Sequence, residues 1–194
     1  RRLSLVDFSR IKIIKDSLHL PREMQLDFNS IAQGYSVDVV ASFLERKGIK
    51  NYLVEIGGEL KAKGVNSENK IWLIGIDKPN ENMNEGEGYQ IILPLENLSL
   101  ATSGNYRKYK EIDGVKYSHT ISTHTGFFAR NRMLSVTVIH PSCMLADAYA
   151  TAFMAMGIKQ TKDFVNLYSE LKVYIVYSDS NGNWRIFTSE NFDT

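Results

Sequence analysis

Asp147 and Thr151 are the residues whose types and spacing point most directly to metal chemistry. They lie in the segment Met144 to Phe153, which has the pattern of a helix, and residues four apart on a helix share one face. Alanines line the rest of that face. A carboxylate and a hydroxyl suit Mg²⁺, which takes few protein ligands and completes its shell with phosphates and water. The alternative is that Asp147 only complements the dipole of its own helix from the first turn.

A second set of polar residues lies between positions 101 and 126. It contains Ser103, Gly104, Arg107 and His119, which we expect to converge at the ends of adjacent strands. Histidine acts as a general base near neutral pH, so His119 is a candidate for that role. His119 and His124 are five apart, which points them to opposite faces of a regular strand and argues against a zinc pair. The alternative is a structural histidine.

Two glycine positions are candidates for ligand contact. Gly34 lies in the first turn of a predicted helix, after the polar residues that follow Leu26, and a helix N-terminus with little side-chain bulk can accept a phosphate. Gly57 and Gly58 lie between two predicted strands, where paired glycines allow a sharp turn or the close approach of a flat ligand. An ordinary capped helix and an ordinary hairpin turn remain the alternatives at these two places.

The elements that must position these residues predict an α+β fold, with mainly antiparallel sheet packed against about three helices. Ile31, Tyr35, Val39 and Phe43 recur every fourth residue, which indicates one amphipathic helix over 31–47, with N-cap chemistry at Asn29-Ser30. Further helices are predicted over 144–156 and 161–171. Strands are predicted over 10–14, 18–20, 52–56, 59–64, 71–76, 88–93, 98–102, 106–112, 116–121, 134–140, 173–177 and 184–187. Most are joined by short turns, such as Asp113-Gly114, which favours antiparallel pairing within one domain over 1–194.

Composition excludes several classes of protein. The 194 residues are 43% hydrophobic and 23% charged, with a net charge of +1, so no basic surface indicates a nucleic acid or an anionic membrane as partner. Neither a GxGxxG nor a GxxxxGK[ST] motif occurs, which argues against a Rossmann or P-loop nucleotide site. Cys143 is the single cysteine and is predicted to be a small core residue.

The first residues of the chain match neither a membrane span, nor a signal peptide, nor the usual start of a protein. No apolar run approaches the roughly 18 residues of a membrane span. The first residues, from Arg1 to Asp7, lack the apolar region of a signal peptide. They open in mid-pattern without a polar lead-in, so we expect the N-terminal part of a longer protein to precede them.

Five segments, in this order, resemble the ApbE family of flavin transferases, once called thiamine-biosynthesis lipoproteins. They are D-F-N-S-I-A-Q-G-Y-S-V-D over 27–38, I-G-G-E over 56–59, S-G-N-Y-R over 103–107, H-T-I-S-T-H-T-G over 119–126, and S-V-T-V over 135–138 leading to A-D-A-Y-A-T-A over 146–152. The resemblance covers nearly the whole chain, apart from the family's N-terminal segment and its lipoprotein signal. It is carried by the order and spacing of five motifs, which makes it specific.

The resemblance implies an enzyme that transfers FMN from FAD to a threonine hydroxyl of an acceptor protein, such as a subunit of a redox complex, and releases AMP. It implies Mg²⁺ held by Asp147, Thr151 and the carbonyl of Ala32, with His119 and Asp147 as catalytic residues. It further implies that FAD or its phosphates contact Ser30, Gln33, Gly57, Gly58, Glu59, Ser103, Gly104, Arg107 and Thr125. An exported, periplasmic or lipid-anchored location is implied in the same way.

The chain departs from the family pattern at two places besides its beginning. Gln33 stands where lysine is common, which removes a positive charge near the phosphates, and Ser122-Thr123 replace the usual Asp-Pro or Asn-Pro. These departures make a non-catalytic protein plausible, and the same site also supports hydrolysis, so two alternatives stand beside the transferase. One is a metal-dependent FAD pyrophosphatase, with water in place of the threonine, and the other is a flavin-binding protein without catalysis.

Overall fold

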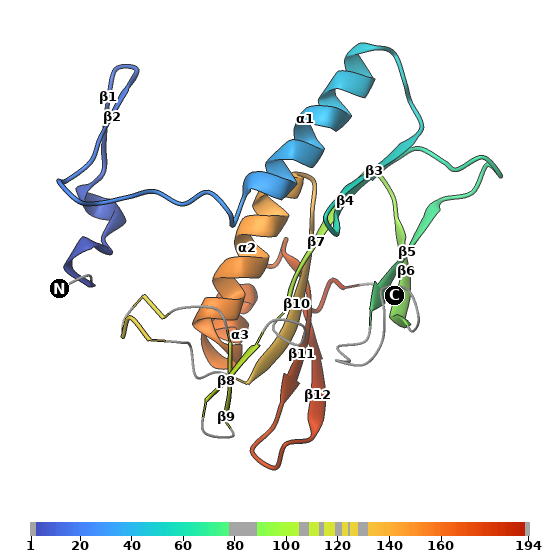
Figure 1. The fold of residues 1–194 in the computed structure, drawn as a ribbon. Coiled ribbons are helices and arrows are strands. Elements are labelled where there is room, and N and C mark those ends of the chain that lie inside the picture. The colour runs from blue at the N-terminus through green and yellow to red at the C-terminus, as the bar shows by residue number, and fades with distance from the viewer. Residues whose placement is uncertain are drawn as a thin grey trace.

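A six-stranded antiparallel sheet forms the centre of the molecule (Figure 1). The computed structural model describes residues 3–77, 89–104, 109–112, 115–118, 122–123, 125–127 and 132–192. The strands of the sheet, in spatial order, are β12 (Trp184–Thr188), β11 (Lys172–Ser178), β10 (Met133–His140), β7 (Ser99–Gly104), β4 (Glu59–Lys63) and β3 (Tyr52–Ile56). Neighbouring strands pair antiparallel throughout, as predicted.

Different layers cover the two faces of the sheet (Figure 1). Val136 and Val138 of β10 pack into a core cluster with helix α2 (Cys143–Met156) and helix α3 (Ile158–Leu167). Ile139 points to the other face, into a cluster with the hairpin of β5 (Trp72–Asp77) and β6 (Tyr89–Leu95). Helix α1 (Ala32–Arg46) packs on α2, β3 and β4. Helices and antiparallel strands thus share one structure, which confirms the predicted α+β class.

Two further hairpins, besides that of β5 and β6, lie outside the central sheet. Near the N-terminus, the 3₁₀ turns Leu3–Leu5 and Phe8–Arg10 lead to β1 (Lys12–Ile14) and β2 (Ser17–His19), whose residues are all exposed. Figure 1 shows this hairpin projecting from the body and joined to α1 by an extended segment. The second hairpin pairs β8 (Tyr109–Ile112) with β9 (Val115–Ser118), as predicted. Its turn residues, 113–114, lie outside the described residues.

Helix α1 forms where its pattern predicts, but its buried face is a different one. Tyr35, Val39 and Phe43 are 56%, 45% and 51% exposed. The buried residues are Gly34, Val37 and Ala41, which are smaller. A periodicity identifies the helix without saying which side meets the neighbouring elements, and here the close contact with α2 selects the side with the least bulk.

The start of α1 also differs from the prediction. Asn29 and Ser30 do not cap the helix, since the residue before it is Ile31, whose side chain makes no capping hydrogen bond. Instead, Asp27 Oδ1 accepts a hydrogen bond from the Asn29 amide at 2.8 Å. The amides of Ile31 and Ala32 both donate to the Phe28 carbonyl. A turn thus leads directly into the helix and takes up two of its free amides.

Two element boundaries are corrected by the structure. Helix α3 spans Ile158–Leu167 rather than 161–171, because Gly157, at a φ of 80°, separates it directly from α2. Strand β7 continues to Gly104, so Ser103 and Gly104 belong to the sheet and pair with Val136 and Ser135 of β10. Among the helices of the described residues, none is long and apolar enough to cross a membrane.

Two leucines near the end of α3 provide a matched test of this packing. Leu171 is 2% exposed and belongs to the cluster beneath α2, whereas Leu167 is 80% exposed. We expect Leu171→Ala to lower the free energy of unfolding by about 2–5 kcal/mol, because it leaves a cavity. Leu167→Ala should change it by no more than about 0.5 kcal/mol. Urea unfolding of both variants measures this, and equal losses would contradict the assigned packing.

Candidate functional site

The site is built around the crossing of α1 and α2. The Gly34 amide, in the first turn of α1, donates a hydrogen bond to Asp147 Oδ2 on α2 at 3.1 Å. A Cβ at Gly34 would lie 2.7 Å from the Cys143 carbonyl carbon and 2.9 Å from Asp147 Cβ, and would also collide with the Cys143 carbonyl oxygen. Only glycine fits there, so Gly34 brings the start of α1 against the Asp147 carboxylate.

The turn between β3 and β4 borders the same place. Gly57 and Gly58 have φ angles of 66° and 101°, in the region that favours glycine, which confirms the predicted sharp turn. A Cβ at Gly57 would collide with Nε2 of Gln33, and it would lie 3.6 Å from Oε2 of Glu59. The side chains of Gln33 and Glu59 therefore flank Gly57, so this turn lies next to the first residues of α1.

Glu59 is a buried carboxylate in this turn region. It is 6% exposed, and its Oε2 is the buried side-chain polar atom without a hydrogen-bond partner among the described residues. Burial, reinforced by the negative charge of Asp147, raises the pKa of Glu59 to about 7. A buried oxygen without a partner carries a desolvation cost, so the geometry favours a donor or cation beside Glu59.

Asp147 is held in a comparable environment. It is 5% exposed, and burial raises its pKa although the bond from the Gly34 amide acts in the opposite direction. The site thus presents two buried carboxylates, Asp147 and Glu59, on two different elements. A positive charge placed between such groups would be attracted by both.

Hydroxyl groups extend the site along α2. Thr151 lies one turn after Asp147, and its Oγ1 is 3.2 Å from the Ser103 Oγ of β7. Thr151 and Ser103 are both partly buried. Two hydroxyls, one from α2 and one from β7, therefore meet one turn along α2 from the Asp147 carboxylate.

These donors fit a hard cation such as Mg²⁺. Within the described residues, no group of three or more His, Cys, Asp or Glu side chains could hold a metal ion by itself. A cation here would take oxygen ligands of other kinds as well, namely hydroxyl, carbonyl and phosphate oxygens, as Mg²⁺ does. The Ala32 carbonyl accepts a hydrogen bond from Ser36 Oγ at 2.7 Å, besides the Ser36 amide that an α-helix beginning at Ala32 places on it, so a cation bound there would replace the bond from the Ser36 hydroxyl.

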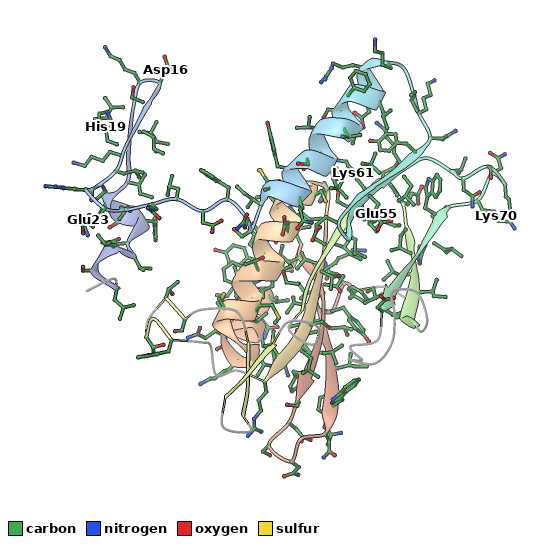
Figure 2. The ribbon with its side chains drawn as sticks, in the orientation of Figure 1. Asp16, His19, Glu23, Glu55, Lys61 and Lys70 are labelled. Atoms are coloured by element: carbon green, nitrogen blue, oxygen red, sulfur yellow. The ribbon has the colours of Figure 1, made fainter. Side chains whose placement is uncertain are left out.

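Asp38 ties three elements together beside the crossing, a role that the sequence patterns did not indicate. Its Oδ1 accepts from Lys61 Nζ of β4 at 2.9 Å, and Lys61 lies beside α1 (Figure 2). Its Oδ2 accepts from Ser142 Oγ at 2.9 Å and from the Met144 amide at 3.1 Å. Burial opposes ionisation, but these bonds hold the pKa of Asp38 below its usual range. The sequence feature that could have drawn attention to Asp38 is its place as the last residue of the motif over 27–38.

The structure brings together one part of the predicted site. Gly34 and Asp147 meet directly, Ser103 meets Thr151, and Gln33 and Glu59 flank Gly57. Gly58 and Gly104 are next to members of this group in the chain, and Ser30 lies half-buried in the turn before α1. Cys143, predicted to be a core residue, is fully buried, and burial raises the pKa of its thiol to about 12.

One predicted residue, Thr125, lies in an exposed turn, and others lie outside the described residues. Thr125 is exposed, in a turn where its amide donates to Ser122 Oγ at 3.3 Å, and no hydrogen bond between described residues joins it to the group around Asp147. His119, Arg107 and His124 lie outside the described residues. Their predicted roles therefore remain predictions.

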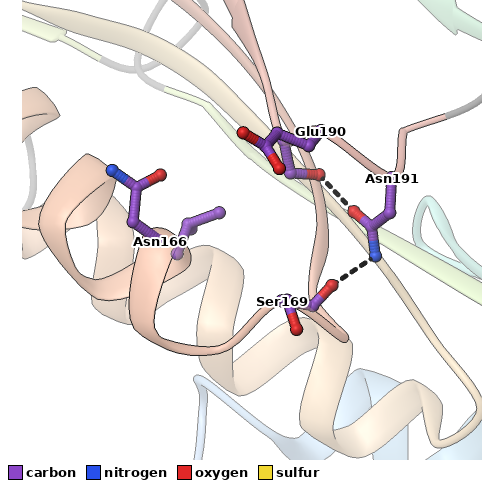
Figure 3. Close-up of a pocket in the computed structure, with 6 residues that line it drawn as sticks. Asn166, Ser169, Glu190 and Asn191 are labelled. Atoms are coloured by element: carbon purple, nitrogen blue, oxygen red, sulfur yellow. Dashed lines mark hydrogen bonds between the residues drawn. The ribbon is translucent and has the colours of Figure 1, made fainter.

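A separate hollow of about 380 Å³ lies between the end of α3 and the segment after β12 (Figure 3). None of the predicted site residues lines it. Three of its polar residues are bonded to one another: Ser189 Oγ donates to Asn191 Oδ1 at 2.8 Å, and Asn191 Nδ2 donates to the Ser169 carbonyl at 2.7 Å. These bonds join the end of the chain to the turn after α3, which is a structural role.

Fold and site together define an α+β protein with an oxygen-rich site at a helix crossing. The ApbE family model matches residues 1–175, and the chain belongs to the ApbE family. It is 47% identical over 135 residues to an FAD:protein FMN transferase of Vibrio cholerae, which covers 70% of this chain and 40% of the relative. It is 37% identical over 161 residues to an FAD:protein FMN transferase of Haemophilus influenzae, which covers 82% of this chain and 45% of the relative. The chain thus spans less than half the length of these two relatives.

Solved structures give the same result for the fold. The flavin transferase ApbE from Vibrio cholerae superposes with a TM-score of 0.86 at 36% identity, over 98% of this chain and 59% of that chain. The apo form of the flavinyl transferase ApbE from Pseudomonas stutzeri superposes with a TM-score of 0.86 at 34% identity, over 98% of this chain and 57% of that chain. The arrangement of α1, α2 and the sheet is therefore the arrangement of this family.

Gly34 provides a test of the crossing. We expect Gly34→Ala to lower the free energy of unfolding by about 1–3 kcal/mol, because the added methyl group forces α1 away from the Cys143 backbone. Val39→Ala, on the exposed side of the same helix, is the control and should change it by about 0.5 kcal/mol or less. Chemical denaturation of both variants measures the difference. Full stability of Gly34→Ala would show that the helices do not approach as described.

Proposed function

We propose that this chain carries the FAD-handling site of a Mg²⁺-dependent FAD:protein FMN transferase, which moves FMN to a threonine hydroxyl of an acceptor protein and releases AMP. One observation carries the proposal: the buried Asp147 carboxylate is fixed by the Gly34 amide, one turn from the Thr151–Ser103 hydroxyl pair. That arrangement offers hard oxygens of the kind that Mg²⁺ and a diphosphate require. Membership of the ApbE family and likeness to named flavin transferases support it.

In this proposal, Asp147, Thr151 and the Ala32 carbonyl hold the cation. Bound Mg²⁺ supplies neutralisation of the charge on the FAD diphosphate. Gly34 fixes the Asp147 carboxylate in position. Gln33 offers an amide donor from the exposed start of α1, and Gly58 has open space beside it for a ligand. Ser103 orients the Thr151 hydroxyl by a hydrogen bond.

The proposed transfer step also uses His119, which lies outside the described residues. The acceptor threonine oxygen attacks the phosphorus on the FMN side of the diphosphate, and a new P–O bond forms as the bond to the AMP oxygen breaks. The threonine proton passes to His119, which acts as the general base. AMP leaves with the electron pair of the broken bond. We propose an exported location for this reaction, facing membrane or exported redox proteins.

The products of one incubation test this function. We expect the protein, mixed with FAD, Mg²⁺ and a threonine-containing acceptor domain, to release AMP and to leave FMN covalently on the acceptor. Chelation of Mg²⁺ should stop both, and its return should restore both. Mass spectrometry of the acceptor and chromatography of the nucleotides give the result. Free FMN with AMP would instead identify a pyrophosphatase, and FAD binding without AMP would identify a flavin-binding protein.

Asp147 gives the sharpest variant for the same assay. We expect Asp147→Ala to reduce AMP release by at least about 100-fold, because a metal ion contributes several kcal/mol to charge stabilisation. Asp163→Ala, on the exposed surface of α3, is the matched control and should keep the wild-type rate. Unchanged turnover in Asp147→Ala would refute the assignment of the metal ligand.

A further inference from the structure

Hydrogen bonds join helices α1 and α2 at two points, which lie one helical turn apart on α1. At the first, Gly34 of α1 donates to Asp147 of α2. At the second, Asp38 of α1 accepts from Ser142 and Met144 at the start of α2. Gly34 and Asp38 are four residues apart on α1, and Cys143, which touches Gly34, is four residues before Asp147. Two contacts fix the rotation and sliding of one helix on the other, whereas one contact would leave a pivot.

Asp38 also connects this pair of helices to the sheet. Lys61 of β4 donates to Asp38 Oδ1 at 2.9 Å and to the Pro141 carbonyl at 3.0 Å. The side chains of Lys61 and Asp38 are each 21% exposed. Lys61 follows Glu59 by two residues on the same strand, so the bond holds β4 and its carboxylate at a set place against α1.

Capping alone does not account for this arrangement. The first turn of α2 already has its own cap, because Ser142 Oγ accepts from the Leu145 amide. Asp38 comes from another helix and satisfies the Met144 amide and the Ser142 hydroxyl at once. A carboxylate that reaches across from α1 makes the position of α2 depend on the position of α1.

We propose that Asp38 is a positioning residue for the cation site, since it fixes α1, which carries the Ala32 carbonyl, against the start of α2, which carries Asp147 and Thr151. The inference rests on the proposed function, because it assumes that these three residues hold a divalent cation. Asp38 touches neither the cation nor FAD. It acts through the relative placement of the two helices that carry the ligands.

Glu45 offers a matched control on the same helix. It too is a carboxylate of α1 that bonds a lysine of β4, with Lys63 Nζ at 2.9 Å, and it also accepts from the Tyr52 hydroxyl at 2.6 Å. It lies near the opposite end of α1 from Gly34. A variant at Glu45 therefore removes a similar bond between α1 and β4 without touching the crossing.

Binding of Mn²⁺ alone, measured by the electron paramagnetic resonance signal of the free ion, tests the proposal. We expect Asp38→Asn to weaken Mn²⁺ binding by about 10-fold or more, the range seen when groups that orient metal ligands are removed. Glu45→Gln should stay within about 2-fold of wild type. Ser142→Ala, which removes one of the bonds to Asp38, should give a smaller loss than Asp38→Asn. Saturating Mg²⁺ should recover most of the rate of AMP release in Asp38→Asn.

Denaturation by urea separates positioning from stability. If Asp38→Asn and Glu45→Gln lose stability but only the first loses Mn²⁺ affinity, the positioning role stands. If Asp38→Asn keeps wild-type affinity for Mn²⁺, or if both variants lose affinity equally, Asp38 has a structural role only and the positioning role is refuted. Should Asp38→Asn fail to fold, Ser142→Ala decides by the same criterion. A wild-type protein that binds no Mn²⁺ would instead overturn the proposed function at its metal site.

Discussion

The contact between Gly34 and Asp147 is the constraint on which the rest of the structure around the site depends. It joins residues 113 positions apart in the chain, and it forms only because Gly34 has no side chain to hold the helices apart. A buried carboxylate needs a donor, and the first free amides of a helix need an acceptor. Each satisfies the other here, so the start of α1 and the carboxylate-bearing face of α2 are brought together by the same bond.

Electrostatics adds a second constraint at the same place. Asp147 and Glu59 are both buried, and the charge of one raises the pKa of the other. The site therefore brings acidic groups together with hydrogen bonds that only partly compensate them, since among the described residues Glu59 Oε2 has no partner. Such a site lowers the stability of the folded chain, and a bound cation would raise it again. The same property that weakens the fold is the one that suits a diphosphate-binding metal site.

Local patterns were enough to predict most elements of the fold, because alternation in strands and turn chemistry act over short distances. The strand around Val136 and the turn at Gly57 are examples, and both are found. The buried side of α1 was not predictable in this way, since Tyr35 and Phe43 have the apolar character of a core face yet lie exposed. Burial there is decided by how closely α2 approaches, which is a property of two segments.

In the candidate site, too, local features could be predicted from the sequence and contacts between distant segments could not. Asp147 and Thr151 could be paired from the sequence because they are one turn apart on a single helix. The contact of Thr151 with Ser103, and the three-way bonding of Asp38, join distant segments and needed the structure. Glu59 was expected as a contact for FAD, but its burial and unpartnered oxygen follow from the way the β3–β4 turn packs against α1.

The location of a divalent cation tests the central claim most directly. Crystals of the protein grown with FAD and Mn²⁺ would give anomalous density for the metal at a single place. The account predicts a peak bound by the Asp147 carboxylate, the Thr151 hydroxyl and the Ala32 carbonyl, with FAD phosphate oxygens completing its shell. A peak elsewhere, or FAD bound with no metal beside Asp147 at saturating Mn²⁺, would contradict it.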